Sequence, residues 1–196
     1  MRKRVQLSFT ARRGNTAHMS ETIARPRPIP ATIGLFFGGL WCWLGALGLP
    51  SAWQMPAGVA GIAVSLLLIV RLWRMKTLAG TGNMLFARGA YILAVAFEIA
   101  AIVIFNLAPR YGWQGQLLPA VGIIVGLHFI GLWRATMMKR FLWIAAGMVA
   151  VSAVSTFLPH TWNGFDPRDA ACGFGNALVL WFGAFQPPEQ PRNRPL

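Results

Sequence analysis

Glu98 is the only acidic side chain well inside a long apolar segment of this sequence. A charged side chain at the centre of a bilayer costs at least ~2.5 kcal/mol, so a carboxyl there is protonated, paired or in contact with water. Residues of this kind commonly lie on proton or substrate pathways. On the 3.6-residue period of a helix, Tyr91 shares the face of Glu98 and Asn106 lies at the edge of that face.

His128 is the only histidine inside an apolar segment. A short connection at residues 109–116 joins its segment to that of Glu98, so we expect the two helices to be neighbours. At ~1.5 Å per residue, Glu98 lies about 15 Å and His128 about 9 Å from the helix ends opposite this connection. The pair either handles protons or coordinates a substrate, or it only fixes helix register. Asn176, in the last apolar segment, needs a hydrogen-bond partner and is a candidate to line a polar cavity.

The connection at residues 159–169 carries His160, Asp166 and Asp169, and this combination of side chains can bind a metal ion. A simpler interpretation makes Asp166 the N-cap of the following helix, with Pro167 at the first helical position and Asp169 at the third. We favour helix capping over a metal site.

The motifs of the common catalytic sites are absent from the sequence. It has no His-Glu-x-x-His, no Gly-x-Ser-x-Gly and no phosphate-binding glycine loop. Two cysteines, Cys42 and Cys172, are too few for a disulfide framework or a zinc motif, and we expect both to be packing residues. We therefore predict that the protein is not an enzyme and has no cofactor or metal.

Six apolar segments must position these residues. Each is close to the ~20 residues that cross the ~30 Å hydrocarbon core of a bilayer as a helix. They predict an all-α membrane protein, a six-transmembrane-helix bundle, in which the lipid bilayer is the main partner. The segments are residues 31–49, 53–70, 90–107, 117–133, 141–158 and 170–185.

Composition and charge agree with this fold class. The 196 residues are 56% hydrophobic and only 12% charged, whereas soluble domains carry roughly 25% charged residues. Lys and Arg number 18 against 5 acids. All but Arg110 and Arg168 fall before the first segment, after the last, or in the second-to-third and fourth-to-fifth connections. Because cytoplasmic loops collect Lys and Arg, both termini are predicted to be cytoplasmic. Basic residues spread between apolar segments do not predict nucleic acid as a partner.

The chain divides into three predicted parts. Residues 1–30 form a disordered basic cytoplasmic arm, residues 31–185 the transmembrane domain and residues 186–196 a cytoplasmic tail. Met19 is an alternative start to Met1. We expect the protein to lie in a bacterial inner membrane.

Small residues predict how the helices pack, because lipid gives helices little hydrophobic reason to associate. Gly34, Gly38, Cys42 and Ala46 are spaced four apart in the first segment, which predicts that they share one packing face of that helix. Gly122 and Gly126 form a similar pair, roughly opposite to His128. Packing within one chain explains these patterns, and they leave a homo-oligomer open. Seven tryptophans lie near predicted helix ends, where amphipathic rings are enriched; Trp41 and Trp43 do not.

The stretch Ile-Ile-Val-Gly-Leu-His-Phe-Ile-Gly-Leu at residues 123–132 resembles a stretch in a family of small, uncharacterised bacterial membrane proteins with several helices. The preceding Ala96-Phe97-Glu98 is similar to that family too. The resemblance covers the third and fourth segments and lacks the proline expected near Ile130-Gly131. It implies no activity, and it implies only that Glu98 and His128 belong to the part worth testing.

Two functions follow as expectations. In the first, the bundle carries a proton, an ion or another small solute and uses Glu98 and His128. In the second, the protein is a non-catalytic membrane scaffold or stress-associated protein whose polar residues hold the helices together. A polar cavity that reaches Glu98 favours the first, and a dry bundle favours the second.

Overall fold

Five helices make up the part of the chain that the computed structural model describes, which is residues 29–74, 89, 92, 96, 99, 103 and 115–186. Within these residues there is no β-strand, only an isolated bridge between Trp162 and Phe165. The all-α prediction is therefore confirmed. The helices are α1 (Ile29–Ala46), α2 (Ser51–Arg74), α4 (Leu117–Thr136), α5 (Lys139–Ser155) and α6 (Pro167–Ala184).

Each of these helices coincides with a predicted apolar segment to within about four residues at either end. The third predicted segment, residues 90–107, lies mostly outside the described residues. Ile92, Ala96, Ile99 and Val103, which are described there, are helical. α1 begins at Ile29, inside the range predicted for the arm. The rest of the arm, and the tail from residue 187 onward, lie outside the described residues.

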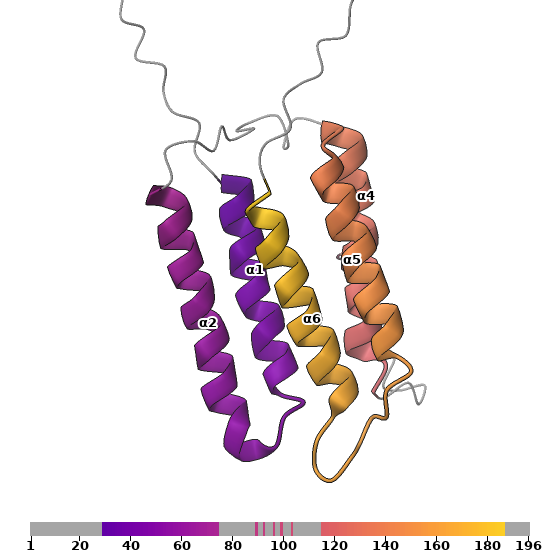
Figure 1. Ribbon diagram of the computed structural model, residues 1–196. Coiled ribbons are helices and arrows are strands. Elements are labelled where there is room, and N and C mark those ends of the chain that lie inside the picture. Colours follow the sequence, from indigo (N-terminus) through magenta and orange to yellow (C-terminus); the bar gives the residue numbers. More distant parts are fainter. Residues whose placement is uncertain are drawn as a thin grey trace, which may run out of the picture.

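α1 and α5 run in the opposite direction to α2, α4 and α6, and α6 lies between α1 and the α4–α5 pair (Figure 1). α1 in turn lies between α2 and α6, so the first and last helices pack against each other. The starts of α1 and α5 and the ends of α2, α4 and α6 share one end of the bundle, which we call the basic end. The α1–α2 turn, the α5–α6 loop and the start of α4 form the other end, the loop end.

The crossing of α1 and α6 depends on two glycines. A Cβ built on Gly173 would overlap the backbone of Gly45 and would lie 2.7 Å from the Trp41 carbonyl oxygen. A Cβ on Gly45 would lie 2.8 Å from the Phe174 backbone nitrogen. These contacts involve backbone atoms, which no side-chain rotation can move aside. The two helices therefore approach this closely only because both positions are glycine.

The prediction of one packing face on α1 was partly wrong. A Cβ added to Gly34 would meet nothing within 4 Å, so Gly34 contributes no close contact. Gly38 lies against the Trp181 ring of α6, whereas Cys42 lies against Gly61 of α2. α1 has neighbours on two sides, and its small residues are divided between them.

Gly122 and Gly126 of α4 do form the predicted packing face. Gly122 lies against Ser152, and a Cβ on Gly126 would lie 2.9 Å from a methyl group of Val149. These contacts join α4 to α5. The main buried cluster lies between α1, α4, α5 and α6 and comprises Trp41, Cys42, Leu132, Phe141, Ile144, Met148, Cys172, Ala177 and Leu180.

Among the described residues, two helices are long and apolar enough to cross a membrane, α2 and the Leu117–Arg134 part of α4. The apolar part of α1, Ala31–Ala46, is shorter. α5 has 17 residues and begins with a Lys-Arg pair, and α6 includes an Arg and an Asp in its first turn. These polar first turns shorten the apolar stretch of both helices, so length and composition alone do not support six crossings.

Candidate functional site

Three of the predicted site residues, Glu98, Tyr91 and Asn106, lie outside the described residues. The pairing of Glu98 with His128 therefore stays a prediction. His128 is half-buried on α4. Its ring meets the Phe129 ring edge-on, with 5.9 Å between the ring centroids.

Asn176 is fully buried on α6, and its side-chain amide bonds to α5. The Nδ2 atom donates to Ser152 Oγ at 3.0 Å and lies 3.5 Å from Cys172 Sγ. Ser155, also buried, donates its hydroxyl to the Ser152 carbonyl at 2.7 Å. Asn176 thus has the hydrogen-bond partner that its burial requires, and its role in lining a polar cavity stays a prediction. Its Oδ1 atom has no hydrogen-bond partner within the part of the chain that is described.

This polar cluster holds α5 and α6 in register. A hydrogen bond within a protein contributes about 0.5–1.5 kcal/mol net, and shifting one helix would leave buried polar atoms without partners, at greater cost. The absence of a side chain at Gly122 leaves space for this cluster, because a Cβ there would lie 2.7 Å from Asn176 Nδ2. From the sequence, Asn176 could be recognised as a buried polar residue. Its partners could not be identified, because Cys172 lies one turn earlier on α6 and Ser152 lies on α5.

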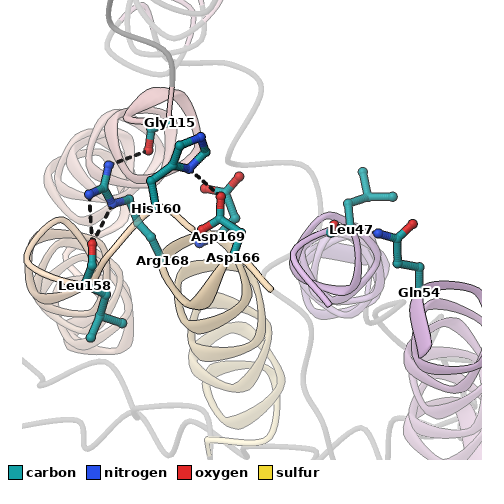
Figure 2. Close-up of polar contacts among 8 residues, drawn as sticks. All are labelled: Leu47, Gln54, Gly115, Leu158, His160, Asp166, Arg168 and Asp169. Carbon is teal, nitrogen blue, oxygen red and sulfur yellow. Dashed lines mark hydrogen bonds and ion pairs between the residues drawn. The ribbon is translucent and has the colours of Figure 1, made fainter. Parts of the chain in front are cut away.

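A second polar cluster occupies the loop end, and Arg168 is its main cross-link (Figure 2). Its Nε and Nη2 atoms donate to the Leu158 carbonyl at 3.0 and 2.8 Å, and Nη1 donates to the Gly115 carbonyl at 3.0 Å. Arg168 thereby joins the start of α6 to the end of the α5 region and to the start of the α4 region. Gly115 has a φ of 85°, a backbone conformation that favours glycine, and a Cβ there would lie 2.8 Å from the His160 ring.

Asp166 caps α6 as predicted. Its Oδ1 atom accepts from the Asp169 backbone N–H at 3.0 Å, and Pro167 follows at the first helical position. Its other oxygen, Oδ2, lies 2.5 Å from His160 Nδ1. The Asp166 backbone N–H also donates to the Gly48 carbonyl at 2.7 Å, which ties the loop to the end of α1. Asp166 therefore caps α6 and connects the start of this helix to His160 in the α5–α6 loop and to Gly48 after α1.

Asp169 lies one residue before the predicted sixth apolar segment. Burial, and to a smaller extent the nearby Asp166 carboxylate, raises the pKa of its carboxyl from 3.8 to about 6. His160 and Arg168 act in the opposite direction. Its Oδ1 atom is buried and, among the described residues, has no hydrogen-bond partner. The Asp169 side chain therefore gains or loses a proton around pH 6.

The described residues hold no group of three His, Cys, Asp or Glu side chains placed to bind a metal ion. His160 and Asp166 contact each other, and Asp166 also serves the helix cap, so both are accounted for by loop structure. This cluster joins the ends of several helices by hydrogen bonds, and its stability depends on pH through the protonation of Asp169.

Comparison with known proteins gives no relative from which a role can be carried over, since no protein-family model, curated protein or solved structure matches the chain. The resemblance of the third and fourth segments to small bacterial membrane proteins therefore stays a prediction. Any function must be argued from the residues themselves.

Proposed function

We propose that this chain is an integral membrane protein that crosses a bacterial inner membrane six times, with both termini in the cytoplasm. The observation that carries the proposal is the exposure of its apolar helices. Only 22% of the apolar window of α2 and 28% of that of α4 are buried. An apolar helix in the core of a soluble protein is mostly buried, because exposing it to water is unfavourable. Lipid is the solvent that suits these helices.

Exposed apolar side chains occur on every described helix. They include Phe36 on α1, Leu67 on α2, Leu127 on α4, Trp143 on α5 and Phe182 on α6. Soluble proteins expose single apolar residues, but contiguous apolar surfaces on all sides are rare in them. The distribution supports crossings by α1, α5 and α6 in addition to α2 and α4.

The described charges support the orientation. The basic residues Arg71, Arg74, Arg134, Lys139 and Arg140 all belong to helix termini at the basic end. At the loop end, Arg168 is engaged with two carbonyl groups and lies near two aspartates. Cytoplasmic ends are enriched in Lys and Arg, so the basic end faces the cytoplasm in this proposal.

Within this bundle, we assign transport of a proton, an ion or another small solute to the hairpin of the third segment and α4. Ile92, Ile99 and Val103 are exposed and lie on one face of a helix. By the helical period of the sequence, Glu98 is separated from that face by about 120°. His128 is similarly about 140° from the face of Gly122 and Gly126 that packs on α5. By the helical period, both ionisable residues are thus placed away from these two faces.

A scaffold without transport is the second candidate, and the Asn176 cluster favours it. Asn176, Ser152 and Ser155 are buried and bond to one another or to backbone. Polar groups used in this way stabilise helix packing and need no solute.

Proteoliposomes that contain the purified chain and an internal pH-sensitive dye separate the two candidates. An imposed pH gradient should dissipate faster than in empty liposomes, and the Glu98→Gln and His128→Gln variants should lose this flux. Glu189→Gln, in the predicted tail, removes an acid outside the hairpin and should keep it. Flux no faster than in empty liposomes would contradict proton transport, and dissipation of an imposed Na⁺ or K⁺ gradient, followed in the same way, extends the test to ions.

A further inference from the structure

The loop between α5 and α6 contains a tight β-turn, Trp-Asn-Gly-Phe, at residues 162–165. The Trp162 N–H donates to the Phe165 carbonyl at 2.7 Å, and the Phe165 N–H donates to the Trp162 carbonyl at 3.0 Å. Asn163 and Gly164, at the centre of the turn, have φ values of 51° and 75°. Left-handed backbone at both central residues is typical of a type I′ turn, for which Asn-Gly is a preferred sequence. The turn is therefore encoded by its own residues.

Contacts on both sides fasten this turn to the bundle. Asp166, which follows the turn, caps α6 and donates its N–H to the Gly48 carbonyl at 2.7 Å. His160, which precedes the turn, contacts the Asp166 carboxylate through Nδ1 at 2.5 Å (Figure 2). The Arg168 guanidinium donates to the Leu158 carbonyl, so the start of the loop is joined to α6 as well. The turn is thus held in place relative to the helix ends.

Large apolar side chains are exposed on and around the turn. Trp162 is 63% exposed, and Phe157, just after α5, is 87% exposed. Trp53, at the start of α2, is exposed at the same end of the bundle. Because the turn is held on both sides, the Trp162 ring has little freedom to move into the protein interior. Its apolar surface is therefore covered by what surrounds the loop end, or it stays in contact with water, which is unfavourable.

Polar side chains of the same loop restrict what these surroundings can be. Thr161 and Asn163 are exposed on either side of Trp162. In the hydrocarbon interior of a bilayer, their side chains would lose their hydrogen bonds to water, which is unfavourable. The boundary between lipid headgroups and acyl chains accepts both kinds of side chain. Tryptophan is enriched there, because its ring is largely apolar and its N–H is polar.

We propose that the turn at residues 162–165 is a membrane anchor, which holds the Trp162 ring at the boundary between headgroups and acyl chains in the leaflet on the loop-end side. This rests on the membrane placement proposed above and does not depend on transport. The partner is the phospholipid bilayer. The α5–α6 loop, which extends past the start of α6 in Figure 1, then lies in the headgroup layer, together with the polar first turn of α6 that contains Arg168 and Asp169.

Fluorescence quenching tests this placement with the full chain in phosphatidylcholine vesicles. The chain has nine tryptophans, so the emission of Trp162 is taken as the difference between the wild type and Trp162→Phe, which keeps an aromatic ring. Nitroxide labels on the lipid headgroup or at a shallow acyl position should quench this emission strongly. A label at the chain ends lies about 15 Å away, near the bilayer midplane, and should quench it weakly. Iodide dissolved on both sides of the membrane should also quench it weakly.

Two further variants test the position of the ring and the contribution of the turn. Trp41→Phe makes the same substitution in the buried core cluster, and its difference emission should be quenched weakly by every label and by iodide. Gly164→Pro prevents the type I′ turn, because proline cannot adopt a φ of 75°. In that background, the Trp162 emission is measured against Gly164→Pro/Trp162→Phe. It should be quenched less by the shallow labels and more by iodide than in the wild type.

Four results would overturn the proposal. Strongest quenching by iodide would place Trp162 in water, and strongest quenching by the chain-end label would place it in the hydrocarbon interior. Quenching by none of these agents would indicate that a protein surface covers the ring, and unchanged quenching in Gly164→Pro would refute the role of the turn. Extraction of cell membranes with alkaline carbonate keeps this test separate from the membrane proposal. A chain that leaves the membranes contradicts both, whereas a chain that stays in them with Trp162 in water contradicts only the anchor.

Discussion

Replacing Gly173 by alanine tests the closest helix contact in the bundle. The added Cβ would overlap the Gly45 backbone and the Trp41 carbonyl oxygen, so α1 and α6 must move apart or bend. Adding one methyl group to a well-packed interior costs typically about 1–3 kcal/mol. The upper part of this range applies, because the obstructing atoms belong to a helix backbone. Alanine also gains about 1 kcal/mol over glycine in a helix, which offsets part of the loss.

Gly34→Ala is the matched control. Gly34 also lies in a helix, but a Cβ there would meet nothing within 4 Å. It should therefore gain up to about 1 kcal/mol of helix stability without any clash. The two variants make the same chemical change, and we expect their unfolding free energies to differ by about 2–3 kcal/mol, with Gly173→Ala the less stable.

Thermal unfolding of both variants and the wild-type chain in one detergent measures this difference. For chains of 150–250 residues, 1 kcal/mol corresponds to about 2–4 °C in Tm. Gly34→Ala should unfold at or above the wild-type temperature, and Gly173→Ala several degrees below Gly34→Ala. Equal Tm values for the two variants would refute the close α1–α6 crossing.

Three further predictions concern the loop end. Arg168→Gln removes three charge-assisted hydrogen bonds to two carbonyl groups, so it should lower the unfolding free energy by about 2–4 kcal/mol, measured as a lower Tm. Arg168→Lys should restore only part of this stability, because an ammonium group cannot donate in the same planar arrangement. Full stability in Arg168→Lys would contradict the role of the guanidinium group. Asp166→Ala should lower the unfolding free energy by about 1–2 kcal/mol, because the helix loses its cap. Asp166→Asn should keep most of that stability, because its amide oxygen can still accept the capping hydrogen bond. Equal Tm values for Asp166→Ala and Asp166→Asn would refute the role of the cap. Burial raises the pKa of Asp169 from 3.8 to about 6. Between these two pH values the folded state therefore binds more protons than the unfolded state. The stability that the protonated Asp169 contributes is fully present below pH 3.8 and is lost as the pH rises through about 6. The Tm should therefore fall between pH 4.5 and 7.5 by more in the wild type than in Asp169→Asn, modestly because the side chain is partly exposed; equal falls would contradict the raised pKa.

Features encoded by neighbouring residues were predictable from the sequence. The cap of α6 is one, because Asp166, Pro167 and Asp169 lie within four residues of one another and their roles depend only on local backbone geometry. The five described helices are another, since each follows from an uninterrupted apolar segment.

Contacts between distant residues were not predictable. Arg168 bonds to Gly115, 53 positions earlier, through a backbone carbonyl that every residue possesses. Trp181 was expected to lie at a membrane boundary, yet its Nε1 atom donates to Ser65 Oγ on α2 at 2.9 Å. It reaches α2 because its ring lies against Gly38 of α1.

Glycine spacing gave a similar mixture of results. The interval of four residues identified Gly122 and Gly126 correctly, because both lie on the face of α4 that packs on α5, with Asn176 of α6 also beside Gly122. On α1 the same interval selected Gly34, which makes no close contact, and did not select Gly45, which makes the closest one. A spacing rule assumes one packing face per helix, and α1 has two. Trp41, unexplained by the rule for helix ends, is buried in the main core cluster.

The central claim is that the chain crosses the membrane with its basic end in the cytoplasm, and labelling of single cysteines tests it most directly. In a background in which Cys42 and Cys172 are alanine, Ser51→Cys and Thr161→Cys place thiols at exposed sites of the loop end, and Met137→Cys places one at the basic end. A membrane-impermeant maleimide is applied to intact bacterial spheroplasts. We predict that Ser51→Cys and Thr161→Cys are labelled, and that Met137→Cys is labelled only after the membrane is permeabilised. Labelling of Met137→Cys in intact spheroplasts, or protection of all three sites until permeabilisation, would contradict the claim.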